Sequence, residues 1–200
     1  MQHKRTLAFI GAGNMSRSII AGLIQAGYPA GRIIAANPSR PKLDELADQF
    51  GIRITQNNAE AAREADVIVL AVKPQLMAAM LEALVAELGS LAGKLLISIA
   101  AGIKVERLQE MAGGHARIIR TMPNTPSLLG LGMTGLYAPT GIAQADRDFA
   151  EQMMQAVGKT LWVAQESGIN GVIAAAGSAP AYFFLFMQGI AEEAEAMGFT

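Results

Sequence analysis

The sequence contains no cysteine, and this absence excludes several kinds of chemistry for a chain of 200 residues. Disulfide bonds, thiolate nucleophiles and zinc sites built from thiolates all require cysteine side chains. We therefore predict no metal centre. The length is sufficient for one domain, or one and part of a second, with a sizeable apolar core.

Charged residues are also scarce, at 16% of the chain against about 25% in average soluble domains. The net charge is −1 and basic residues do not cluster, which argues against nucleic acid or an acidic membrane surface as the main partner. Hydrophobic residues make up 52% of the chain, more than a lone domain needs to bury. This excess predicts a subunit interface and hence a homo-oligomer.

Long uninterrupted apolar runs are missing. The first apolar segment has about four residues, too few for a secretory signal. The longest uncharged apolar stretch, residues 171–187, contains Gly177-Ser178-Ala179-Pro180, which we expect to interrupt a membrane-spanning helix. We predict a cytoplasmic protein.

The most informative motif that is present lies near the amino terminus. An apolar strand over residues 7–10 runs into Gly-Ala-Gly-Asn-Met-Ser at residues 11–16, and apolar residues then recur at helical spacing. Gly11 allows a tight turn, and Gly13, without a Cβ, lets a pyrophosphate approach the helix amino end. Ser16 replaces the usual third glycine or alanine but is small. The alternative is a glycine turn that binds nothing.

The tip of the second expected strand, residues 32–36, bears on which dinucleotide is bound. NAD-specific sites have an acidic residue there, whereas this chain has Asn37-Pro38-Ser39-Arg40. With no carboxylate to repel a 2′-phosphate and with Asn37, Ser39 and Arg40 able to donate to it, the sequence favours NADP(H) over NAD(H). The alternative is a solvated turn with an incidental arginine.

Further strands and helices alternate along the chain, which is typical of an α/β fold. Residues 66–72 are apolar on both alternating faces, as in a parallel strand covered by helices on both sides. We predict a Rossmann-type, doubly wound, mainly parallel sheet. Lys73 at the end of that strand would meet a cofactor or cap the rim, and Asn57 or Asn58 would cap a helix or contact the cofactor.

From about Ser167 the pattern is helical alone, with helices expected at residues 169–176 and 181–197 on either side of the Gly-Ser-Ala-Pro segment. The second is apolar over most of its surface, and about thirty residues are too few to bury it. We predict a dinucleotide-binding domain over residues 1–164. Residues 165–200 would begin a helical dimerisation and substrate domain that is incomplete here.

Five motifs together resemble pyrroline-5-carboxylate reductases. They are Gly11-Ala12-Gly13-Asn14-Met15, Ala71-Val72-Lys73-Pro74, Ala100-Ala101-Gly102, the segment from Arg120 to Pro126 that reads Arg-Thr-Met-Pro-Asn-Thr-Pro, and Gly177-Ser178-Ala179-Pro180-Ala181-Tyr182. The resemblance covers essentially the whole chain. It implies an enzyme that passes hydride from NADPH or NADH to the imine carbon of 1-pyrroline-5-carboxylate, giving L-proline.

The resemblance also implies the cofactor contacts. The phosphates would lie at Ile10, Gly11, Ala12, Gly13, Asn14 and Met15. Asn37 and Ser39 would lie by the adenine ribose, and we add Arg40 for its charge. The cofactor would also be lined by Asn58, Ala71, Val72, Lys73 and Pro74. Ala100 and Ala101 would lie beneath the nicotinamide half, which Glu166 would also face.

Two departures from the family pattern bear on activity. The family usually reads Ser-Gly-Ser-Gly-Pro-Ala-Tyr where this chain has Ala-Gly-Ser-Ala-Pro-Ala-Tyr at residues 176–182. Relatives continue past Thr200 with helices that form an intertwined dimer and with a loop that grips the substrate carboxylate, so we expect this chain to lack half the substrate site.

No catalytic acid is assigned from the sequence. Hydride adds readily to a protonated imine, and both His3 and His115 lie outside the motifs, while Tyr182 is expected in helix packing. Two alternatives stay open: a reductase of another small imine or keto acid, and a non-catalytic NADP(H)-binding module.

Overall fold

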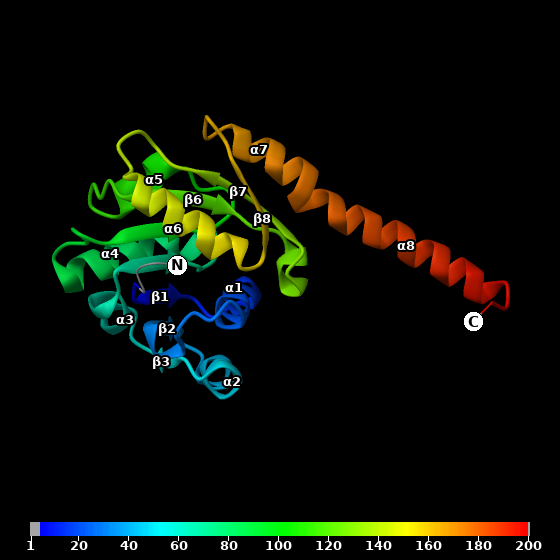
Figure 1. The fold of residues 1–200 in the computed structure, drawn as a ribbon, viewed down its shortest axis with the longest axis horizontal. Helices are drawn as coiled ribbons and strands as arrows, with labels where there is room; N and C mark the ends of the chain where they lie inside the picture. Colours follow the sequence, from blue (N-terminus) through cyan, green and yellow to red (C-terminus); the bar gives the residue numbers. More distant parts are fainter. Residues whose placement is uncertain (1–4, 200) are drawn as a thin grey trace.

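A single eight-stranded sheet forms the centre of the computed structural model, which describes residues 5–199 (Figure 1). The strand order is β3-β2-β1-β4-β5-β6-β7-β8, and every neighbouring pair is parallel except β6 with β7. The strands are β1 (Leu7–Ile10), β2 (Ile33–Ala36), β3 (Arg53–Thr55), β4 (Val67–Leu70), β5 (Leu95–Ser98), β6 (Ile118–Met122), β7 (Gly132–Tyr137) and β8 (Gly158–Trp162). The predicted Rossmann-type, mainly parallel sheet is confirmed.

Helices cover both faces of this sheet. One face carries α1 (Asn14–Gln25), α2 (Arg40–Phe50) and α6 (Gln144–Gln155), and the other carries α3 (Asn58–Glu64), α4 (Met77–Leu88) and α5 (Val105–Met111). Every residue of β4 is buried, because its alternating side chains enter two separate apolar clusters. This arrangement confirms the two-sided burial that the apolar run at residues 66–72 predicts.

A buried carboxylate joins elements at the edge where the parallel strands begin. Asp146, on the first turn of α6, is 2% exposed and accepts from Arg5 Nη1 at 2.8 Å. Arg117, just before β6, donates to both oxygens of the same carboxylate. A buried carboxylate is stabilised only when it is paired in this way, so Asp146 fixes α6 against the start of β1 and β6.

The carboxyl-terminal region is one continuous helical rod that projects from the sheet domain (Figure 1). It consists of α7 (Gly168–Val172), a π-helical segment (Ile173–Ser178) and α8 (Ala179–Ala196). The predicted interruption at Gly177-Ser178-Ala179-Pro180 is therefore wrong. Gly177 and Ser178 end the π-helical segment, a form common at functional sites, and Ala179 and Pro180 begin α8.

Proline continues this helix because another segment supplies the missing hydrogen bond. Pro180 has no N–H to donate to the carbonyl four residues earlier, that of Ala176. The Asn124 side chain takes its place, with Nδ2 donating to the Ala176 oxygen at 2.9 Å. Its Oδ1 accepts from the Met133 N–H at 2.9 Å, which anchors the helix to β7.

The helix over Gly168–Ala196 is long and apolar enough to span a membrane. A helix that packs on protein passes the same test of length and composition, so this observation alone carries little weight. Because the helix is continuous, the expected interruption at residues 177–180 no longer argues against a membrane-spanning helix.

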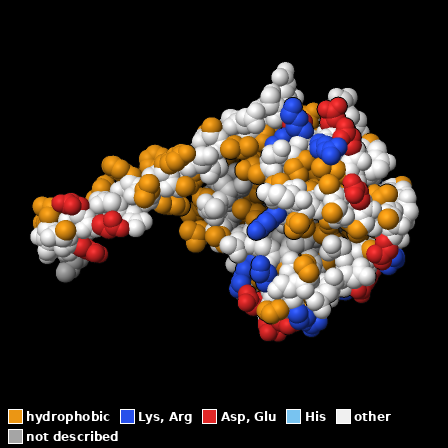
Figure 2. All heavy atoms as spheres, turned by 180° about the vertical axis from the view of Figure 1, so that it is seen from behind, with side chains coloured by type: hydrophobic (Ala, Val, Ile, Leu, Met, Phe, Trp, Pro, Cys, Tyr) orange, Lys and Arg blue, Asp and Glu red, His pale blue; other side chains and the backbone are white. Residues whose placement is uncertain are grey.

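Apolar side chains cover the projecting helix without contacts that bury them. No residue of α8 is buried, and the side chains from Tyr182 to Phe186 are 59–70% exposed. Figure 2 shows hydrophobic groups along this arm and acidic groups near its end. A helix with this surface requires a partner that the described residues do not supply.

Candidate dinucleotide site

The centre of the site is the point where the chain changes direction across the sheet. β1 lies between β2 and β4, and in such sheets ligands bind in the crevice at the carboxyl ends of the strands. Gly11 follows β1 with φ +112°, and a Cβ built there would lie 2.5 Å from the Ala71 carbonyl oxygen. Only glycine fits between these two segments.

Gly13 and Ser16 shape the turn in different ways. A Cβ at Gly13 would meet no protein atom within 4 Å, so this face of the turn is open, and no side chain caps the amino end of α1 there. Ser16 is 1% exposed, and its hydroxyl donates to the Gly11 carbonyl at 2.7 Å. The sequence predicted only that Ser16 is small enough to fit; the hydrogen bond is an additional finding.

The segment after β2 reaches the glycine turn through Asn37. Its Oδ1 accepts from the Ala12 N–H at 3.3 Å, and its Nδ2 donates to the Ser39 carbonyl at 3.3 Å. Asn37 therefore acts as a bridge between two loops. Ser39 precedes α2 without making a capping bond, and the exposed Arg40 donates through Nε to Asp44 at 2.7 Å.

Asn57 and Asn58 differ in role. Asn57 caps α3, because its Oδ1 accepts from the Ala59 and Glu60 N–H groups at 2.8 and 3.1 Å. The capping interpretation is thus confirmed for Asn57. Asn58 is the first residue of α3 and lines a cavity of about 330 Å³ together with Met80 on α4.

Two further loops lie at the same edge of the sheet. After β4, Ala71 and Val72 are partly buried and Lys73 is exposed, and Pro74 begins a short 3₁₀ helix, Pro74–Leu76. After β5, Ala100 is 6% exposed and its N–H donates to Ser98 Oγ at 3.3 Å. The sequence-predicted residues after β1 to β5 therefore lie along one edge, because they follow parallel strands.

Glu166 follows β8, which together with β7 runs antiparallel to the other strands. It nevertheless forms a hydrogen bond with the segment after β5. Its Oε1 accepts from the Val105 N–H at 2.8 Å and from Arg120 Nη1 at 2.9 Å. Arg120 is 5% exposed and was not among the residues we predicted for the site. The available signal was a charged residue directly after two buried isoleucines in a strand.

The histidines add nothing to this edge. His115 bonds through Nε2 to the Lys94 carbonyl at 2.9 Å, at the opposite edge where β5 begins, and burial lowers the pKa of His115. His3 lies outside the described residues.

Comparisons with known proteins identify similar chains over the full length. A family model described as NADP oxidoreductase, coenzyme F420-dependent, matches residues 6–102. The pyrroline-5-carboxylate reductase of Vibrio alginolyticus is 56% identical over 199 residues, which cover 100% of this chain and 72% of that protein.

Solved structures of two such reductases are also similar to this chain. A pyrroline-5-carboxylate reductase from Coxiella burnetii superposes with a TM-score of 0.90 at 40% identity, over 99% of this chain and 73% of that one. The Plasmodium falciparum pyrroline carboxylate reductase, solved with NADP bound, gives a TM-score of 0.85 at 27% identity, over 98% and 71%.

The open face at Gly13 generates a direct test. We expect Gly13→Ala to leave the melting temperature close to wild type, because the added methyl group meets no protein atom. The same methyl group would occupy the space of a pyrophosphate and should weaken dinucleotide binding at least about tenfold, measured by calorimetry. Gly31→Ala, also in open space but before β2, is the matched control and should change neither quantity. Unchanged binding by Gly13→Ala would exclude this turn as the phosphate site.

Proposed function

The chain belongs to the pyrroline-5-carboxylate reductase family, and from this premise we propose how its residues serve the reaction. The 56% identity with the Vibrio enzyme across the whole chain is the observation that carries the function. The chain is an NAD(P)H-dependent oxidoreductase that reduces the C=N bond of 1-pyrroline-5-carboxylate to give L-proline, the last step of proline biosynthesis, and NADP(H) is its cofactor.

The residues at the carboxyl edge fit such a cofactor. The open space at Gly13 and the uncapped amino end of α1 match the needs of a pyrophosphate, since N–H groups and the helix dipole favour negative charge there. NADPH supplies the hydride when it is bound. The protein's task is to hold the nicotinamide carbon against the imine carbon and to exclude water.

We assign the cofactor contacts by loop. Residues at the end of β1 and in the turn after it contact the phosphates, and residues after β2 contact the adenine ribose and its 2′-phosphate. Residues after β4 and at the start of α3 line the cofactor. Residues after β5 and β8 contact the nicotinamide half. The set is Ile10, Gly11, Ala12, Gly13, Asn14, Met15, Asn37, Ser39, Arg40, Asn58, Ala71, Val72, Lys73, Pro74, Ala100, Ala101 and Glu166. No general acid is assigned, because a protonated imine accepts hydride without one.

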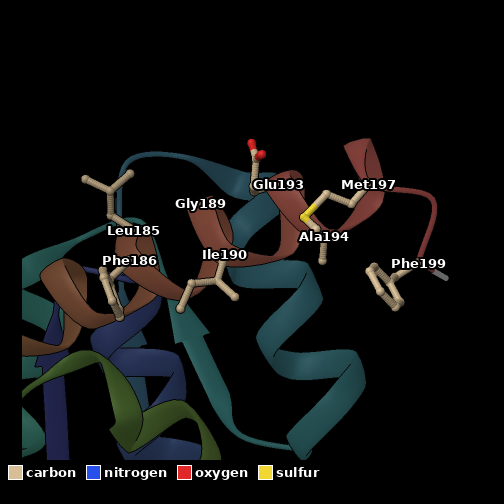
Figure 3. Close-up of a pocket in the computed structure, with 8 residues that line it drawn as sticks. All are labelled: Leu185, Phe186, Gly189, Ile190, Glu193, Ala194, Met197 and Phe199. Carbon is tan, nitrogen blue, oxygen red and sulfur yellow. The ribbon is translucent and has the colours of Figure 1, made fainter.

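We further propose self-association through the carboxyl-terminal helix, in the cytoplasm and without nucleic acid or membrane as partner. Residues 1–164 form the dinucleotide domain, and residues 165–200 begin the helical one. The exposed apolar surface of α8 supports this division. Figure 3 shows Phe186 and Ile190 on one side of α8 and Met197 with Phe199 at its end, where they line a hollow of about 620 Å³.

The activity is tested by following NADPH oxidation with 1-pyrroline-5-carboxylate added to the chain. We expect turnover with this imine and none with a panel of 2-keto and hydroxy acids. Turnover confined to the acids would point to a different reductase. NADPH binding without any turnover would indicate a binding module.

The preference for NADPH is tested at Arg40. We expect Arg40→Ala to raise the KM for NADPH about three- to tenfold and to leave the KM for NADH unchanged, because only NADPH carries the phosphate. Arg53→Ala, which removes a similarly exposed arginine paired with Glu64, should alter neither KM. An equal rise for both dinucleotides would refute the assignment.

Self-association is tested on the exposed helix. We expect Phe186→Asp to raise the dissociation constant of self-association at least about tenfold, measured by sedimentation velocity, because a charge would enter an apolar interface. The fold should be retained, since Phe186 is 68% exposed. Glu192→Gln on the same helix is the control that leaves the apolar surface intact. A wild-type chain that sediments as a monomer at all concentrations would contradict the proposal.

A further inference from the structure

Arg120 is an unusual residue for the strand that contains it. It lies in β6 with 5% of its surface exposed, directly after the buried Ile118 and Ile119. A guanidinium withdrawn from water is costly unless it is paired and hydrogen-bonded. Its Nη1 donates to Glu166 at 2.9 Å, while its Nε is buried without a hydrogen-bond partner. Glu166 is thus the one carboxylate among the described residues that pairs with this guanidinium.

The same carboxylate oxygen performs a second task. Glu166 Oε1 also accepts from the Val105 N–H at 2.8 Å, at the start of α5, where Lys104 provides no side-chain cap. Val105 comes three residues after Gly102, the end of the Ala100-Ala101-Gly102 turn. The carboxylate therefore fixes the chain immediately beyond that turn to the end of the sheet.

We propose that Arg120 is a positioning residue for the nicotinamide half of the cofactor, acting through Glu166. Its charge orients the Glu166 carboxylate. Through the hydrogen bond to the Val105 N–H, the carboxylate keeps the Ala100-Ala101-Gly102 turn in the position where it can contact the nicotinamide ring. This inference rests on the proposed function, which assigns that turn and Glu166 to the nicotinamide half. The phosphate and adenosine portions are assigned to other loops, so they do not depend on Arg120.

The chain supplies a matched control for a merely structural arginine. Arg117 precedes the same strand and pairs with Asp146, which is 2% exposed, at the opposite edge of the sheet. Arg117→Met should lower the melting temperature because it removes one partner of a buried carboxylate. It should leave cofactor binding within about twofold of wild type, because Arg117 lies away from the proposed site.

The test compares two ligands by calorimetry, NADPH and 2′-phospho-ADP-ribose, which lacks only the nicotinamide ring. We expect Arg120→Met to weaken NADPH binding about tenfold and 2′-phospho-ADP-ribose binding less than about twofold. Glu166→Gln should give the same pattern. The double variant should be no weaker than either single one, because both changes break one chain of contacts. Arg120→Lys should restore part of the NADPH affinity.

Several results would overturn the inference. Equal losses for both ligands would mean that Arg120 supports the fold in general, and additive losses in the double variant would mean that it does not act through Glu166. If Arg120→Met does not fold, Glu166→Gln decides alone, and unchanged NADPH affinity in that variant refutes the inference. A wild-type chain that binds neither ligand would refute the proposed function itself.

Discussion

The contact between Gly11 and the Ala71 carbonyl is the constraint on which the site depends. β1 and β4 are neighbours at the point where the order of the strands along the sheet reverses, and the segments that follow them approach too closely for any side chain at Gly11. Gly11 also leaves β1 with a φ of +112°, which favours glycine a second time, and α1 begins at Asn14 directly after the turn. Ser16 and Asn37 hold this arrangement by hydrogen bonds to the turn. The exposed amino end of α1 is a consequence of that geometry.

The few charges that enter the interior lie where elements must be joined. A sheet covered on both faces has no water to solvate an ion, so each buried charge needs a partner from another segment. Asp146 joins α6 to the beginnings of β1 and β6, and Arg120 joins β6 to the segments around α5 and α7. Charged residues make up only 16% of the chain, and the buried ones described here each join two or more elements.

The carboxyl-terminal helix follows a different rule from the sheet domain. The strands bury their apolar residues within the chain, whereas α8 exposes aromatic and aliphatic groups along its length. This exposed apolar surface is the one that the proposed self-association would cover. The helix continues through Pro180, and the Asn124 side chain supplies the hydrogen bond that the proline cannot donate to the Ala176 carbonyl.

The sequence alone determined the features that depend on neighbouring residues. Apolar strands alternating with amphipathic helices specified a mainly parallel sheet, and the spacing of Gly11 and Gly13 identified the turn, because each pattern is read within a few positions. Five ordered motifs were enough to indicate the family. The tertiary structure decided what depends on distant partners. The Asn124 amide meets the Ala176 carbonyl across 52 positions, and Arg120 meets Glu166 across 46. Local spacing carries no signal for such contacts, so the expected break at Pro180 was wrong and Arg120 was overlooked.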